Sequence, residues 1–406
     1  MFLKVYLCGA TQKPLSPVSN ISLFSQIISK LDRSKFNKLV KTHKSDKHQK
    51  GFDSWSHLVS MLFCQFAKSQ SVRDISNGLR SATGNLNHLG MNKAPSKSTV
   101  SYQNKNRSWE LFRDYYYVLL DSLGQQAQMK RTKFKIKSKI FLLDATTISL
   151  CLNLFDWAKY KTKKGAVKMH TLLDYDGHLP SYVNITDGKT ADNKGAYDIP
   201  LLKGSVIVAD RFYNDFSLLN VWDSTGVYFV IRHKDNIKFK TLKELDLPQD
   251  MHPQLLKDEM IELTGTQTKE KYPKRLRRVA LWDEKNKQTI EVITNQMSWT
   301  ANTITELYKA RWQVEIFFRD IKQQLHIKSF IGTSQNAVMI QIWTALITIL
   351  ILKALKTQAK HSWYLSNLVA FIRLNLFVKV ELHKWLDNPF QKEQPPPDNR
   401  LQGVLF

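Results

Sequence analysis

Cysteine is scarce in this chain. Its 406 residues include only three cysteines, Cys8, Cys64 and Cys151, and none of them stands in a Cys-x-x-Cys pair or at a Cys/His ligand spacing. A disulfide framework or a structural zinc site is therefore not expected, and the composition fits a reducing compartment.

The chain also lacks an apolar run of membrane-spanning length. Residues 337–352 are mostly apolar, but Gln341, Thr344 and Thr348 interrupt them and Lys353 follows. Because a membrane-spanning helix needs about 20 apolar residues, we predict a buried core helix here and no membrane partner. Residues 1–7 carry one lysine and lead into a polar stretch, so no signal peptide is expected.

Acidic residues are outnumbered throughout the chain. Asp and Glu together number 35 against 60 Lys and Arg, which gives a formal net charge of +25 and a sequence pI near 9.8. An excess of this size, spread over the whole chain, attracts polyanions, and nucleic acid is the expected partner. A generally basic protein without such a partner is the alternative interpretation.

Residues 20–125 have the apolar spacing of helices and follow an N-terminal extension, 1–19. A short helix over 71–79, a turn region and a second helix over 96–107, rich in Lys, Ser, Asn and Gln, are typical of a helix-turn-helix that reads a DNA groove. A plain helical bundle fits the same spacing. The apolar sets are Phe24, Ile27, Ile28 and Leu31; Trp55, Leu58, Leu62 and Phe66; and Trp109, Phe112, Tyr116, Leu119 and Leu120.

After a basic connector at 130–139 the pattern changes to strands. The expected strands cover 140–143, 168–173, 179–185, 205–209 and 227–231, and the expected helices cover 191–202 and 212–222. The turn signal at 175–177 joins the second and third strands. Three strands joined as hairpins, followed by strands alternating with helices, match the α/β ribonuclease H-like fold, a mixed sheet flanked by helices.

A β-rich insertion is expected over 234–300, where β-type runs replace the alternating pattern. The ribonuclease H-like catalytic domain would then span 139–233 and 301–360. A C-terminal helical segment and tail would occupy 361–406, with disorder expected after Lys392, where prolines cluster.

The segment 307–325 predicts a helix with two neighbouring stripes. At about 100° per residue, four polar residues fall within an arc of roughly 60°. Beside them lies an apolar stripe with core spacing. The polar stripe is Tyr308, Arg311, Glu315 and Lys322, and the apolar stripe is Leu307, Val314, Phe318, Ile321 and Leu325. For Arg311 and Glu315 alone, a surface ion pair is the simpler interpretation.

Three carboxylates are candidates for one metal site. Asp144 and Asp210 each follow an expected strand, and Glu315 lies on the polar stripe. Together they could hold two Mg²⁺ ions about 4 Å apart for an in-line displacement at a phosphodiester. Taken singly, each aspartate is more simply explained as a turn or cap residue.

The motifs as a set resemble those of a known family. Tyr308, Arg311, Glu315 and Lys322 reproduce Y-x2-R-x3-E-x6-K, and Leu-Asp-Ala-Thr-Thr at 143–147 and Ala-Asp-Arg-Phe-Tyr at 209–213 precede it. The chain is similar to DDE transposases of bacterial insertion sequences, in the subgroup named for the YREK signature. Residues 20–123 resemble that family's helical N-terminal domain, and 139–355 resemble its catalytic domain with the β insertion. Many relatives have Gly where Phe212 stands here.

This resemblance implies a cut-and-paste mechanism, with a hairpin intermediate at the element's ends. It implies Asp144, Asp210 and Glu315 as ligands of two Mg²⁺ ions, which Mn²⁺ would replace. It also implies that the remaining polar stripe residues contact the terminal DNA phosphates. A homodimer would act on double-stranded DNA, namely the terminal inverted repeats of its own element and a target, in the bacterial cytoplasm at the nucleoid.

Two other functions fit the same residues. One is a structure-selective nuclease of the same fold that cuts without rejoining, and the other is a catalytically silent DNA-binding repressor. Four further residues remain open: His170 and Asp174 on the second strand as neighbours of the metals, and Trp282 and Trp299 as stacking partners of a flipped base. For each, a packing role is the simpler expectation, and Asp192 is expected to be a helix N-cap.

Overall fold

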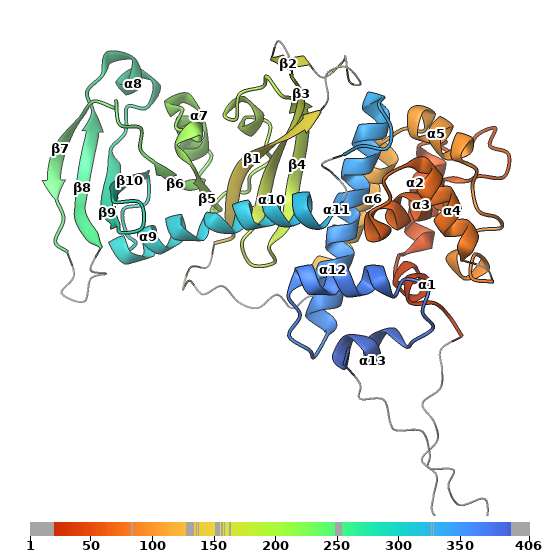
Figure 1. Cartoon of the computed structure of the whole chain (residues 1–406). Helices are drawn as coiled ribbons and strands as arrows, with labels where there is room; N and C mark the ends of the chain where they lie inside the picture. The colour runs from red at the N-terminus through yellow and green to blue at the C-terminus, as the bar shows by residue number, and fades with distance from the viewer. Residues whose placement is uncertain are drawn as a thin grey trace, which may run out of the picture.

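The structure is a computed structural model that describes residues 20–390 apart from several short stretches. Those stretches are 83, 127–133, 135, 137, 151–154, 156, 158, 162–163, 248–253, 326 and 328. The expected N-terminal extension, most of the basic connector and the proline-rich tail lie outside the described residues. The rest is a mixed α/β protein in which a helical region stands at one end of a large sheet (Figure 1).

Polar caps define the helices of the N-terminal region. Their bounds are α1 Leu23–Ile28, α2 Arg33–Thr42, α3 Ser54–Ala67, α4 Val72–Ser81, α5 Lys97–Asn106 and α6 Glu110–Gln126. Ser22, Asp32, Asp53, Ser71 and Ser96 each accept a bond from a backbone N–H in the first turn of the helix that follows. The expected helical pair corresponds to α4 and α5, which pack on each other across residues 82–96. A groove-reading role for α5 stays a prediction.

The apolar run near the C-terminus is a buried helix, as predicted. This helix, α11 (Gln335–Gln358), packs against α3, α5, α6 and α12 (Leu365–Leu374), and α13 (Leu382–Asp387) completes the region. Its length and mean hydropathy of 2.1 would suit a membrane span, but 89% of that window is buried inside the protein. Buried core helices share these properties, so they are weak support for a span.

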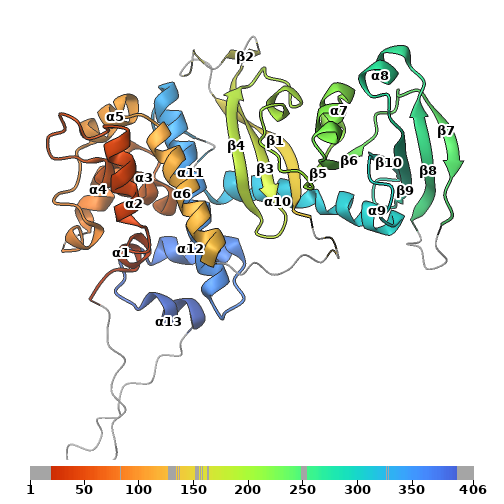
Figure 2. The ribbon, with the colours of Figure 1, turned by 180° about the vertical axis from the view of Figure 1, so that it is seen from behind.

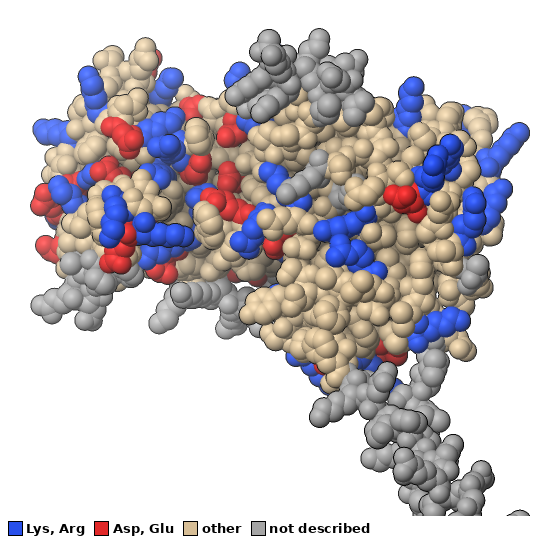
Figure 3. All heavy atoms as spheres, in the orientation of Figure 1, with Lys and Arg blue, Asp and Glu red and all other residues tan. Residues whose placement is uncertain are grey.

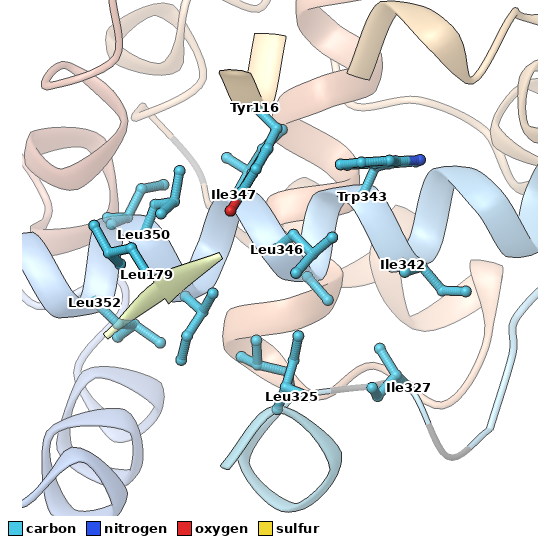
Figure 4. Close-up of a cluster of buried hydrophobic side chains, with 14 of the residues drawn as sticks. Tyr116, Leu179, Leu325, Ile327, Ile342, Trp343, Leu346, Ile347, Leu350 and Leu352 are labelled. Atoms are coloured by element: carbon cyan, nitrogen blue, oxygen red, sulfur yellow. The ribbon is translucent and has the colours of Figure 1, made fainter. Parts of the chain in front are cut away.

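Helix α11 also links the helical region to the sheet. In Figure 4, its side chains meet Tyr116 of α6, Leu179 of a sheet strand, and Leu325 and Ile327, which follow the helix before it. One continuous hydrophobic core therefore runs from the N-terminal helices to one face of the sheet. A second core covers the opposite face, where α7 (Phe216–Ser224) packs.

The sheet has ten strands in the order β2-β3-β1-β5-β6-β10-β9-β8-β7, with β4 paired to β3. Strands β1, β5 and β6 are parallel, and the other pairs are antiparallel. The bounds are β1 Ile140–Leu150, β2 Lys159–Lys161, β3 Lys164–Asp174, β4 Leu179–Asp187, β5 Val206–Ala209, β6 Tyr228–Arg232, β7 Phe239–Glu244, β8 Leu255–Leu263, β9 Leu276–Asp283 and β10 Gln288–Thr294.

The expected β-rich segment is joined edge to edge with the main sheet. Strand β10 pairs with β6, so β7 to β10 and the short helix α8 (Thr266–Lys271) extend the sheet away from the helical region. Figure 2 shows this extension from the other side, with α9 (Ala301–Ala310) and α10 (Trp312–Gln324) running along the sheet toward α11.

Two elements of the sheet region differ from the sequence prediction. Strand β1 does not end at Asp144 but continues to Leu150, because β3 keeps pairing with it. The expected helix 191–202 is only a short 3-10 turn, Lys194–Ala196. Two features explain that: Pro200 cannot continue a helix, and Gly195 lies so close to His170 that a Cβ would be 2.6 Å from Nδ1.

Two expected helices are divided. The one predicted at 212–222 begins at Phe216, where Asp215 caps it, after a 3-10 turn at Arg211–Tyr213. The one predicted at 307–325 is interrupted at Arg311, where bonds from Arg311 N to Tyr308 O (3.1 Å) and from Val314 N to Arg311 O (3.0 Å) tighten the chain. Arg311 keeps α-helical dihedrals, φ −49° and ψ −33°, so α9 and α10 remain nearly continuous.

Candidate active site

Two aspartates meet where the parallel pairing of β1 and β5 ends. The paired residues run from Ile140 and Val206 to Leu143 and Ala209. Asp144 and Asp210 are the next residue of each strand. Since neighbouring strands lie about 4.8 Å apart, these aspartates are neighbours at one sheet edge. The convergence predicted from sequence is thus present, although β1 itself continues beyond it.

Helix α10 carries Glu315, which is linked to Asp144 because both carboxylates contact the guanidinium of Arg311. Arg311 donates from Nη2 to Oε1 of Glu315 at 2.6 Å, and its Nη1 lies 3.6 Å from Oδ2 of Asp144. Its Cζ also lies 5.9 Å from the centre of the Tyr308 ring. The polar stripe therefore faces Asp144. Arg311 and Glu315 do form the ion pair of the simpler interpretation, but the Arg311 side chain is only 16% exposed and shares its charge with Asp144.

The apolar stripe holds these helices on the sheet. Leu307, Val314, Phe318, Ile321 and Leu325 are all buried, as the spacing predicted. Because this side is fixed in the core, the polar side has little freedom to move away from β1.

Lys322 anchors the far end of the polar stripe to β1. Its Nζ donates to Oγ1 of Thr146 at 2.5 Å and to the carbonyl of Thr147 at 2.9 Å. An open groove of about 410 Å³ lies between this lysine and the carboxylates of Asp144 and Glu315, and Asp210 is not among its lining residues. It is lined by Asp144, Ala145, Thr146, Glu315, Phe318, Arg319, Lys322 and Gln323.

Burial dominates the electrostatics of the aspartates. It raises the pKa of Asp144 to about 7; the N–H of Ala145 opposes the shift, Asp210 and Glu315 add to it, and Arg311 opposes it. Burial also raises the pKa of Asp210, against the N–H of Phe212 and the charge of Arg311. Both carboxyls are therefore poorly solvated, and the one cation that opposes the pKa shift of both is Arg311.

The side chains of Asp144, Asp210 and Glu315 suit a hard divalent cation, but in this structure their carboxylates are not close enough together to bind one ion. Every candidate ligand is a carboxylate oxygen, the donor that Mg²⁺ prefers. Within the described part of the chain, no three His, Cys, Asp or Glu side chains are close enough to hold a metal ion. The guanidinium of Arg311 instead occupies the space between Asp144 and Glu315. The donor set fits, provided that this cation moves.

The other residues considered from sequence lie outside the groove. His170 is buried, and its Nε2 lies 3.0 Å from Oγ1 of Thr186. Burial lowers its pKa to about 4. Asp174 accepts from the N–H of Asp176 in the hairpin turn, and Asp192 pairs with Lys168 rather than capping a helix.

Neither Trp282 nor Trp299, the two tryptophans of the β-rich segment considered above, lies at the site. Trp282 lies at the end of β9, and Trp299 packs 5.8 Å from the ring of Tyr228. Two exposed aromatics next to the motifs in sequence were not singled out as site residues: Phe212 and Trp312 are 59% and 56% exposed. The sequence signal that could have found them was their position: Trp312 directly follows Arg311, and Phe212 lies two residues after Asp210. Thr146 was likewise part of a motif already noted.

Comparison with known proteins places the chain in a family. The model described as "Transposase DDE domain" matches residues 135–351, and one described as "Domain of unknown function (DUF4372)" matches residues 19–92. "Probable transposase for insertion sequence element IS5377" of Geobacillus stearothermophilus is 28% identical over 68% of this chain and 72% of its own length. "Putative transposase for insertion sequence element IS4SA" of Synechocystis is 24% identical over 87% and 98%.

A solved structure, described as a cryo-EM structure of the piggyBac transposase synaptic complex with hairpin DNA, is also similar. The match covers 93% of this chain and 86% of the solved chain, with 10% sequence identity and a TM-score of 0.40. A similarity this low supports no inference. The first family model alone spans more than half of the 406 residues. It also contains both strand-end aspartates and the whole polar stripe. The chain therefore belongs to the DDE transposase family of insertion sequences.

Proposed function

We propose that this protein is a transposase of the YREK-signature subgroup that cuts its own element out of DNA and joins it to a target. Asp144, Asp210 and Glu315 would be the catalytic carboxylates and would hold two Mg²⁺ ions. The observation that carries this proposal is the parallel end of β1 and β5, beside which Arg311 bridges Asp144 and Glu315.

The protein's own residues would position the DNA end. When bound, the two metal ions supply activation of the attacking oxygen and charge stabilisation of the leaving oxygen. Arg311 carries a fork of donors that matches a phosphate. Lys322 would contact a phosphate near the scissile bond, and the buried Tyr308 would add a hydroxyl donor beside them.

The strained charge balance suggests an order of events. In the DNA-free protein, Arg311 compensates two carboxylates. If its guanidinium turns to a DNA phosphate, Asp144 and Glu315 become available to a metal ion. End binding and metal binding would then favour each other, because each removes the competitor of the other.

The fold and assembly belong to the same proposal. The strand order β4-β3-β1-β5-β6 supports a ribonuclease H-like core over 139–233 and 301–360, with 234–300 as its insertion and 20–125 as a helical DNA-binding domain. We propose a homodimer that pairs two terminal inverted repeats before target joining, in the cytoplasm at the nucleoid.

The test is a cleavage reaction on labelled DNA that carries the parent element's ends. Wild type and Glu315→Gln are compared in Mg²⁺, Mn²⁺ and EDTA, with duplex binding measured alongside. The proposal expects metal-dependent cleavage at the element boundary and joining to a target plasmid, while Glu315→Gln binds but does not cleave. Nicks without joining would instead identify a nuclease, and binding without cleavage by wild type would identify a silent DNA-binding protein.

A further inference from the structure

A dense run of positive charge covers α2 and the turn that follows it. Residues 33–50 contain seven Lys or Arg and a single acidic residue, Asp46. All seven basic side chains are exposed. They are Arg33, Lys35, Lys38, Lys41, Lys44, Lys47 and Lys50. Figure 3 shows Lys and Arg gathered with few acidic neighbours at the end of the molecule formed by the N-terminal helices, whereas both signs mix at the β-rich end.

The structure separates the basic side chains into two groups. Arg33 lies 5.1 Å from the centre of the Trp55 ring, and Lys35 donates to Oγ of Ser122. The side chains of the other five have no hydrogen-bond or ion-pair partner among the described residues. We call these five, Lys38, Lys41, Lys44, Lys47 and Lys50, the basic strip.

The carboxylate within residues 33–50 does not neutralise the basic strip. Asp46 accepts from the N–H and the hydroxyl of Ser54, at 2.8 and 2.7 Å, and pairs with Arg107 at 3.3 Å. These partners belong to α3 and to the end of α5, so its charge is already compensated. The strip therefore presents five charges to solvent without local acidic compensation.

The opposite side of α2 fixes the strip in place. Phe36 is fully buried, with its ring centre 5.6 Å from that of Trp55 and 4.8 Å from that of Tyr115. His43, the residue after the helix, lies 2.8 Å from Oδ2 of Asp114 on α6. Because both contacts anchor the backbone, the lysines project from a rigid support.

The backbone of the strip is unusual at Lys44. The N–H of Ser45 bonds to the carbonyl of Val40, and that of Lys44 to Lys41, as in a Schellman helix end. Glycine usually fills the left-handed position of this motif, yet Lys44 has φ +50°. His48, with φ +61°, repeats the feature one turn later. Non-glycine residues in this conformation concentrate at functional sites.

We propose that the basic strip is a DNA-backbone contact surface that neutralises duplex phosphates independently of sequence. This inference rests on the proposed function, since it assigns part of the DNA binding to a surface distinct from the α5 helix. Lysines spaced three residues apart supply point charges without base selectivity. According to this proposal, Lys44 stands in a left-handed backbone position that glycine would fill more easily, because its positive charge contacts DNA there.

The salt dependence of binding tests the proposal without knowledge of the element's ends. Each phosphate neutralised on B-DNA contributes about −0.9 to the slope of log K against log salt. The triple variant Lys38→Gln, Lys41→Gln, Lys44→Gln should therefore lower the magnitude of the slope by about 2.7 on a duplex of arbitrary sequence in EDTA. The matched control removes three exposed lysines from the C-terminal segment, Lys360→Gln, Lys379→Gln, Lys384→Gln, and should leave the slope unchanged.

Variants of Lys44 separate charge from backbone conformation. Lys44→Gly should raise the melting temperature, because glycine adopts the left-handed conformation without strain. It should also lower the magnitude of the slope by about 0.9, as Lys44→Gln does, whereas Lys44→Arg should keep the slope. A residue present only for the helix end would give no change of slope in any of these variants.

Two failures can be told apart. Equal slopes for the strip variant and its C-terminal control, with strong binding by wild type, would overturn the basic strip and leave the transposase proposal intact. If wild type binds a duplex of arbitrary sequence with no salt dependence, or does not bind it, the basic strip is overturned; the transposase proposal falls only if wild type also fails to bind and cleave DNA that carries the element's ends.

Discussion

Replacing Asp144 by Asn should stabilise the metal-free protein at neutral pH. Burial raises the pKa of this carboxyl from 3.8 to about 7. A carboxyl with a raised folded-state pKa gives stability that is complete below pH 3.8 and is lost as pH rises to about 7. Asn keeps the shape and removes the charge, so the variant should escape that loss.

The size of the effect follows from the shift. At 1.36 kcal/mol per pKa unit, a rise from 3.8 to about 7 corresponds to roughly 4 kcal/mol. About 3 kcal/mol of this should develop between about pH 5 and about pH 8. The Asp144 side chain is 16% exposed, so solvent screens it little. The contact with Arg311 opposes the shift and is already included in it.

The assay is urea unfolding in EDTA at several pH values, for wild type and Asp144→Asn. Asp198→Asn, at an exposed position, controls for the change of net charge. Adding Mg²⁺ should then stabilise wild type by about 2.7 kcal/mol at a concentration a hundred times the dissociation constant, and the variant less. A variant that is no more stable than wild type at about pH 8 in EDTA would refute the reasoning, because Asp144 would then not be held in an unfavourable charged state.

Three further predictions concern the core and the site. Phe36→Ala should lower the free energy of unfolding by about 3–5 kcal/mol, measured by urea denaturation, because its fully buried ring fills the space under α2. Burial lowers the pKa of His57 from 6.5 to about 3, so wild type should lose stability as pH falls from 6.5 toward 3, and His57→Gln should flatten that loss in a pH series of thermal melts. Lys322 bonds β1 just beyond Asp144, so Lys322→Met should weaken cleavage more than duplex binding while circular dichroism shows an unchanged fold. Equal losses of cleavage and binding would argue against a role near the scissile phosphate.

Periodicity recovered the helices because it reflects burial directly. The apolar sets at 24–31, 55–66 and 337–352 correspond to α1, α3 and α11, each with its apolar face in the core. Strands β1, β3, β4, β5 and β6 were found where apolar runs were bounded by turn residues, whereas β2, β7 and β8 had no predicted bounds. Periodicity missed the length of β1, because pairing with β3 decides it across the sheet. It also missed that the segment 191–202 forms only a short 3-10 turn, where Pro200 cannot continue a helix and Gly195 lies against His170.

The candidate site was predictable as a set of residues but not as an arrangement. Sequence order indicated that Asp144, Asp210 and Glu315 would share one edge of the sheet. It did not show that Arg311 would bond two potential metal ligands, or that Lys322 would bond Thr146. Side-chain rotamers and the tightened turn at Arg311 set those contacts, and neither leaves a periodic signal.

The chain alone determined what depends on local composition. It fixed the excess of positive charge, the helical and strand segments, the motif spacing and the apolar stripe that faces the core, since each follows from neighbouring residues and their solvation. Only the tertiary structure decided that the β-rich segment extends the main sheet, that α11 joins the helical region to the site helix, and that the side chains of five lysines on α2 and the turn after it stand unpaired among the described residues. The physical reason is that pairing partners, burial of charge and side-chain contacts depend on residues far apart in sequence, which only the packed chain brings together.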